Sequence, residues 1–219
     1  MRITISLFIL GIIFFLSSCK SPYFTSANNM RYINGVVKLK DGNEVSGPIS
    51  SSLADYYSTN AYITVTPNNS KEQRVSVTQI RGISVRNNYY EPKLVDMGFG
   101  SHDQLLFLKK FTKEASRMDL YELYEQRTNN SRNGTYYTDV YSYYINAPGK
   151  TNEVWNLEGK HLTPNFEDKM SEMVKDCPSL AQKISSKEKG YFYAQVSLVT
   201  EKRIETMMNI IDEYNKCGK

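Results

Sequence analysis

One stretch decides the fold class of this chain: Tyr32-Ile33-Asn34-Gly35-Val36-Val37-Lys38-Leu39-Lys40-Asp41-Gly42-Asn43-Glu44-Val45. Apolar residues recur at alternate positions along much of it, which is typical of a strand with one buried face. Asp41-Gly42 is a strong signal for the turn of a β-hairpin. The stretch therefore predicts two antiparallel strands, 32–40 and 44–49, that meet at this turn.

Strand signals continue on the C-terminal side of the hairpin. Short segments rich in β-branched residues lie between polar turns, at 61–66, 74–77 and 80–85. This spacing is typical of a small antiparallel barrel or meander. The Asp-Gly hairpin, followed by Gly47-x-Ile49, resembles the opening of an SH3-like or Sm-like barrel. We expect a barrel-like or meander segment over residues 30–95.

Residues 96–162 predict a second antiparallel segment. Its expected strands are 105–111, 118–124, 136–145 and 154–157. The polar residues 126–134 predict a loop. Leucines over 103–127 also fit helical spacing, but the later alternation of aromatic and β-branched residues favours strands.

The last third of the chain changes to helical periodicity. Thr163 as N-cap and Pro164 at the first helical position predict a helix start, and Pro178 predicts its end. A short helix over 180–184 and a third helix capped by Thr200 follow. The expected buried stripes are Phe166, Met170, Met173 and Val174, then Ile204, Met207, Met208, Ile211 and Tyr214. The predicted fold class is α+β, an antiparallel β body followed by a helical segment over 163–219.

The N-terminus has the pattern of a lipoprotein signal peptide over residues 1–18. A basic residue precedes an apolar run, and Leu16-Ser17-Ser18-Cys19 resembles a bacterial lipobox. The apolar run is shorter than the ~20 residues of a spanning helix; an uncleaved anchor and an ordinary secretory signal are the alternatives. We expect Cys19 to carry lipid and residues 19–29 to form a tether.

The remaining cysteines suggest a disulfide. Lipidation of Cys19 leaves Cys177 and Cys217 as an even pair in an oxidising compartment. A bridge would close a loop of about 40 residues and stabilise the fold by roughly 3–4 kcal/mol; two free thiols are the alternative. Neither cysteine has a second Cys or His at ligand spacing, so no metal site is predicted.

The sequence contains no recognisable catalytic or cofactor motif. Its two histidines, His102 and His161, lie outside any known frame, and no glycine-rich phosphate loop is present. We therefore predict no catalytic residue, metal or cofactor. The competing hypothesis is a hydrolase of envelope or polysaccharide substrates that uses paired carboxylates. The candidate carboxylates are Asp96, Asp103, Asp119, Glu122 and Asp139.

Tyrosine is the unusual residue of the composition, with 17 in the chain. Tyrosine suits half-exposed strands, which is the simplest interpretation. Alternatively, Tyr137, Tyr141 and Tyr143 share one strand face and form a platform for an envelope protein, peptide or glycan. Without Arg2 the chain has 26 basic and 23 acidic side chains, a net charge of +3. This small, scattered excess argues against nucleic-acid binding.

Motifs at both ends carry a family resemblance. They are the lipobox, Leu39-Lys40-Asp41-Gly42-Asn43-Glu44-Val45-x-Gly47, Asp176-Cys177-Pro178-x-Leu180 and Glu213-Tyr214-Asn215-x-Cys217. Together they resemble exported proteins of Bacteroidetes-type bacteria, which join a β-rich N-terminal part to a helical C-terminal part and mostly lack an assigned function. The resemblance implies a lipid-anchored protein of the cell envelope, in the outer membrane, and supplies no catalytic residues. We expect a non-enzymatic binding or structural lipoprotein.

Overall fold

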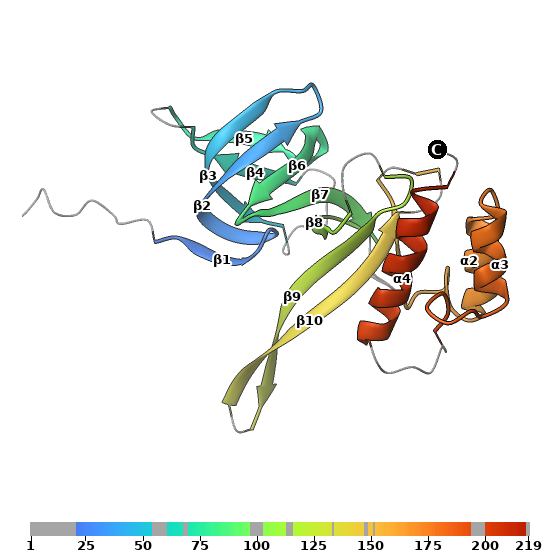
Figure 1. Ribbon diagram of the computed structural model, residues 1–219. Helices are drawn as coiled ribbons and strands as arrows, with labels where there is room; N and C mark the ends of the chain where they lie inside the picture. The colour runs from blue at the N-terminus through green and yellow to red at the C-terminus, as the bar shows by residue number, and fades with distance from the viewer. Residues whose placement is uncertain are drawn as a thin grey trace, which may run out of the picture.

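An antiparallel sheet of 11 strands followed by three α-helices forms the part of the chain that the computed structural model describes. The described residues are 21–53, 61–67, 70–96, 103–112, 116–132, 134–146, 149–150, 152–193 and 200–217, so Cys19 lies outside them. Figure 1 shows the first strands curled together at one end and the helices gathered at the other. The predicted α+β class is confirmed.

The strands follow one another with short connections. They are β1 (Tyr23–Ser26), β2 (Asn29–Leu39), β3 (Glu44–Ser52), β4 (Tyr62–Val65), β5 (Gln73–Ser76), β6 (Ile80–Val85), β7 (Asn88–Val95), β8 (Gln104–Lys110), β9 (Leu120–Ser131), β10 (Gly134–Asn146) and β11 (Val154–Asn156). Their order is β11-β10-β9-β8-β7-β6-β2-β3-β4-β5, and β1 pairs separately with β2. The two predicted β segments, 30–95 and 96–162, therefore form one continuous sheet.

The Asp-Gly hairpin is present as predicted. Lys38 of β2 lies opposite Glu44 of β3, and Gly42 in the turn has a φ of +92°. Further along the same pair, Gly47 adopts a φ of +152°, and a Cβ atom there would lie 2.2 Å from the carbonyl oxygen of Thr66. Only glycine permits this close approach of β3 to the chain that follows β4. The sheet can therefore curl around the first apolar core.

Three predictions for the strands need correction. The expected tether of residues 19–29 is wrong from Tyr23 onward, because β1 pairs with β2 and Asn28 is buried. Strand β7 lies within the predicted 30–95 segment, but none of the strands expected there covers it. The predicted loop 126–134 is mostly strand, since β9 extends to Ser131. Its residues are exposed on both faces of a projecting hairpin, so they lack the apolar alternation that predicts a strand (Figure 1).

The helices are α2 (Phe166–Met173), α3 (Pro178–Ser185) and α4 (Thr200–Tyr214). The first predicted start is wrong, because Asn165 occupies the N-cap position and the Thr163–Pro164 peptide bond precedes the helix. Pro178 lies at the first position of α3, where its missing N–H costs nothing. Among the described residues, no helix is long and apolar enough to cross a membrane.

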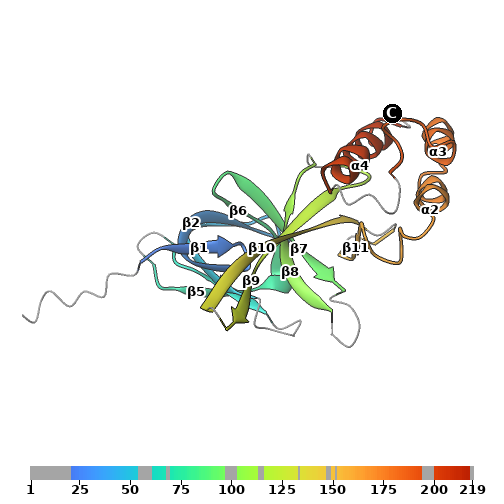
Figure 2. The ribbon, with the colours of Figure 1, turned by 90° about the horizontal axis from the view of Figure 1, so that it is seen from below.

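The helices bury a second core against the end of the sheet. Phe166, Met170 and Val174 are buried, as the stripe predicted, and the last helix adds Met207, Ile210 and Ile211. They pack with Leu120 of β9 and Ile145 of β10. Figure 2 shows the helices at this end of the long hairpin. The face of the β9–β10 hairpin that carries Leu120 and Ile145 is covered by the helices only at this end. Farther along the hairpin the same face is exposed, as at Tyr141.

Candidate ligand-binding site

Beyond the helices, four neighbouring strands bring aromatic and charged side chains to one surface. Tyr90 of β7 lies opposite Lys109 of β8, and Lys109 lies opposite Glu122 of β9. Glu122 in turn lies opposite Tyr143 of β10. Residues that are opposite in an antiparallel pair point to the same side of the sheet. We call this surface the aromatic face; its members are Tyr90, Lys109, Phe111, Glu122, Tyr124, Tyr141 and Tyr143.

An ion pair lies in the middle of the aromatic face. The Lys109 ammonium is 3.7 Å from Oε1 of Glu122 and 4.8 Å from the centre of the Phe111 ring. The hydroxyl of Tyr143 donates a hydrogen bond of 3.2 Å to Oε2 of Glu122. Burial and the charge of Glu122 raise the pKa of Tyr143 to about 12, so this phenol stays protonated. The central charges are therefore compensated and hold the neighbouring rings in place.

Two tyrosine rings form the outer part of the face. The rings of Tyr124 and Tyr141 pack with their centres 5.2 Å apart and their planes at 50°. The hydroxyl of Tyr124 donates a 2.8 Å hydrogen bond to Asp139, and this bond raises the pKa of Tyr124 to about 12. Tyr141 keeps 52% of its surface exposed. This pair offers ring surface to a ligand with a carboxylate directly beside it.

A hollow of about 200 Å³ separates this tyrosine pair from β1. Residues 24–28 form one wall of the hollow, and Lys109, Tyr124 and Tyr141 contribute to the other. Asn28 holds β1 in position, since its side chain donates to the carbonyl of Phe107 at 2.9 Å and accepts from the Phe107 N–H at 2.7 Å. Pockets that enclose a drug-sized ligand measure ~300–1,000 Å³. The hollow therefore suits one unit of a larger ligand.

The three tyrosines predicted from the sequence do not all belong to this face. Tyr141 and Tyr143 do, whereas Tyr137 lies four residues nearer the hairpin tip, about 13 Å away at the usual strand rise. Tyr137 is 65% exposed and lies opposite Thr128. Sequence reasoning missed Tyr90, Lys109, Phe111 and Tyr124 as binding residues. Only the strand register brings them together, so no local pattern could have indicated them.

The candidate carboxylates do not converge on the aromatic face. Glu122 belongs to it, and Asp139 points to the same side of β10 but lies four residues from Tyr143, the partner of Glu122. This offset is about 13 Å, whereas the two carboxyl groups of a glycosidase lie ~5–9.5 Å apart. Asp119 points to the opposite side of the sheet. Asp96 and Asp103 lie just outside strand ends, at positions that the aromatic face does not reach.

The described part of the chain contains no candidate metal site. No three His, Cys, Asp or Glu side chains come together there as a potential metal site. The ring of His161 stacks on Trp155 with the centres 4.5 Å apart. His102 lies outside the described residues.

A compensated charge network lies on the inner side of the same strands. The Lys110 ammonium is 3.2 Å from both Glu91 and Asp119, and Lys93 is 2.9 Å from Glu91. The hydroxyl of Tyr121 donates to both carboxylates, at 2.9 and 3.2 Å. Burial alone would raise the pKa of Glu91, but Lys93, Lys110 and Tyr121 together hold it below its ordinary value. Burial and both carboxylates raise the pKa of Tyr121 far above its ordinary value.

This network is better suited to structure than to catalysis. Each carboxylate has a lysine and a phenol as partners, so the charges are balanced and β7, β8 and β9 are held in register. A general acid must carry a proton at the working pH, and a lowered pKa keeps Glu91 ionised instead.

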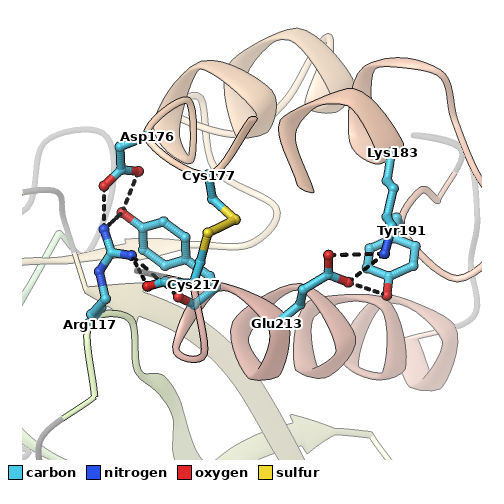
Figure 3. Close-up of a disulfide and its surroundings, with 8 residues drawn as sticks. Arg117, Asp176, Cys177, Lys183, Tyr191, Glu213 and Cys217 are labelled. Atoms are coloured by element: carbon cyan, nitrogen blue, oxygen red, sulfur yellow. Dashed lines mark hydrogen bonds and ion pairs between the residues drawn. A yellow bond between two sulfur atoms is a disulfide. The ribbon is translucent and has the colours of Figure 1, made fainter. Parts of the chain in front are cut away.

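A disulfide joins Cys177 and Cys217, as predicted, and cross-links the helical segment. Their sulfur atoms are 2.11 Å apart, and the bridge spans 40 residues (Figure 3). Beside it, Arg117 donates to the carbonyl of Cys217 at 2.8 Å and forms an ion pair with Asp176. The Arg117 guanidinium also lies 4.2 Å from the ring centre of Tyr214. The end of α4 is thereby tied both to α3 and to the chain that enters β9.

No protein-family model, curated protein or solved structure matches this chain. Its function is therefore inferred from its fold and its surfaces. The aromatic face has the properties of a binding surface, since exposed rings lie beside fixed polar groups on a rigid sheet. The chain is therefore an α+β protein with a candidate ligand site on the surface of its sheet.

Proposed function

We propose that this chain is a lipid-anchored protein of the cell envelope that binds a glycan on the aromatic face and catalyses no reaction. The observation that carries the proposal is the Tyr124–Tyr141 ring pair beside Asp139, in which Tyr141 is exposed and Tyr124 partly exposed. Aromatic rings pack against the C–H face of a sugar ring, and carboxylates and phenols bond its hydroxyls. The hollow beside the pair has room for one unit of such a polymer.

The proposed location in the cell envelope rests on sequence features that are independent of the aromatic face. The lipobox at Cys19 would place the protein on a membrane outside the cytosol, and the family resemblance favours the outer membrane. The Cys177–Cys217 bridge is in keeping with an oxidising compartment.

The chain offers a matched pair of variants to test the ligand site. Tyr141 and Tyr136 belong to the same strand and are similarly exposed, at 52% and 56%, but they point to opposite sides of it. Binding is screened on an array of envelope and host polysaccharides, and the best ligand is then titrated by calorimetry. Tyr141→Ala should weaken binding about tenfold or more, as expected for a central aromatic contact. Tyr136→Ala should change it less than about twofold.

Three results would contradict the proposal. Equal losses in the two variants would place the ligand elsewhere or attribute the effect to the hairpin as a whole. Capture of peptides and of no polysaccharide on the array would replace the glycan with a peptide ligand. Release of shorter sugars from the bound polymer, measured by chromatography, would favour the hydrolase.

A further inference from the structure

The first strand begins very close to the expected site of lipid attachment. β1 starts at Tyr23, four residues after Cys19. Four extended residues span at most about 14 Å. A lipid on Cys19 would therefore hold β1 within this distance of the membrane surface. The tether predicted over residues 19–29 would have allowed more than twice this distance between the lipid and the first strand.

β1 cannot swing away from the body to lengthen this connection. It pairs with β2, and the turn after it is fixed by three contacts with distant segments. The Ser51 hydroxyl donates to the carbonyl of Ala27 at 2.6 Å, and the Leu53 N–H donates to the carbonyl of Asn28 at 2.7 Å. Asn28 is also bonded to Phe107 on both its polar atoms. The surface around β1 would consequently face the membrane.

That surface contains a second hollow, about 700 Å³ in volume, which Ser21 and Pro22 help to line. We call it the β1 hollow. Arg31, which lies opposite Tyr23 in the β1–β2 pair, is exposed at its edge, and none of the described residues that line the hollow is acidic. The other lining residues that matter here carry hydroxyl groups: Tyr23, Ser50, Ser52, Tyr62 and Thr64.

These residue types fit the headgroup region of a bilayer. Tyrosine is enriched at membrane interfaces, and arginine near the surface is attracted to anionic lipids. Tyr23 is 49% exposed, and the guanidinium of Arg74 lies 3.9 Å from the ring centre of Tyr62. Among the described lining residues, a phosphate group would meet an arginine and several hydroxyl donors and no carboxylate.

We propose that the β1 hollow binds the headgroup of an anionic phospholipid, so that the body rests directly on the membrane that holds Cys19. The orientation rests on the lipid anchor of the proposed function. Headgroup binding by the hollow can be measured without that lipid.

The test uses vesicles of phosphatidylethanolamine and phosphatidylglycerol in a 3:1 ratio and the chain from residue 19 onward with Cys19→Ser. The apolar signal segment is omitted because it would bind vesicles by itself. Arg31→Gln is compared with Arg81→Gln, which removes the same charge from an exposed residue of β6. Arg81 is next to Gly82, the partner of Lys38, and thus lies about 23 Å along β2 from Arg31.

Co-sedimentation should show that Arg31→Gln lowers vesicle binding about fivefold and Arg81→Gln less than twofold. Equal losses in both variants would overturn the site, because they would mean a general attraction of positive charge. Absence of vesicle binding by the unsubstituted chain, or equal binding to pure phosphatidylcholine vesicles, would overturn it as well. Metabolic labelling of Cys19 with a fatty-acid analogue is a separate test: an unlabelled cysteine would overturn the anchor, whereas these vesicle results overturn only the headgroup site.

Discussion

Removal of the Cys177–Cys217 disulfide should destabilise the protein by about 4 kcal/mol. The bridge closes a loop of 40 residues, and the chain-entropy relation gives about 4 kcal/mol for a loop of this length at 25 °C. The perturbation is the double variant Cys177→Ala/Cys217→Ala. The contacts of Arg117 with Asp176 and Tyr214 do not involve either cysteine side chain, so they remain available in the folded variant.

The chain contains a natural probe for this measurement. Trp155 is its single tryptophan, and it packs against the core that the helices form with the sheet. Its fluorescence therefore follows unfolding of the region that the disulfide closes. With a urea dependence of ~1–3 kcal/mol/M, the midpoint of the double variant should be lower by about 1–4 M. Cys19→Ser is the matched control, since it removes a thiol outside the bridge and should leave the midpoint unchanged.

Two results would refute this reasoning. The first is an unchanged midpoint and slope in the double variant, which would show that the bridge does not restrict the unfolded chain. The second is quantitative labelling of Cys177 and Cys217 by a thiol reagent in the denatured, unreduced protein. That result would mean that the two residues are free thiols.

Two further predictions concern contacts between distant strands. Asn28→Ala leaves the Phe107 N–H and carbonyl without their buried partner. It should lower the unfolding free energy measured in urea by roughly 2–4 kcal/mol. Asn129→Ala, on the exposed hairpin, is the control, and an equal loss of stability in that variant would contradict the role of Asn28. The lowered pKa of Glu91 contributes stability above its unfolded pKa of about 4.5, which is lost as the pH falls through the lower folded pKa. The unfolding free energy of Glu91→Gln should therefore fall less steeply below pH 4.5, by up to about 1.4 kcal/mol per pH unit. Glu188→Gln, at an exposed position, is the control. The same pH dependence in both variants would count against this account.

Local patterns in the sequence determined most of the elements. The Asp41-Gly42 turn and the alternation around it predict β2 and β3, because turn chemistry and side-chain period act within a few residues. The apolar stripe of Met207 and Ile211 likewise predicts α4. The cysteine pair is predictable as well, since lipidation of Cys19 would leave only two partners.

The tertiary structure alone decided what the local patterns could not express. β1 has no distinctive period, and pairing with β2 together with the Asn28–Phe107 bonds makes it a strand. Asn165 rather than Thr163 begins α2, because the packing of Phe166 places the helix start.

The candidate sites depend on tertiary structure for the same reason. Tyr90, Lys109 and Glu122 are separated by more than a dozen residues in the chain, and only the register of β7, β8 and β9 makes them neighbours. The sequence by itself determined most of the segments that become strands and helices, because those preferences are local. The surfaces that the strands form together depend on long-range pairing, and this pairing is a property of the folded sheet.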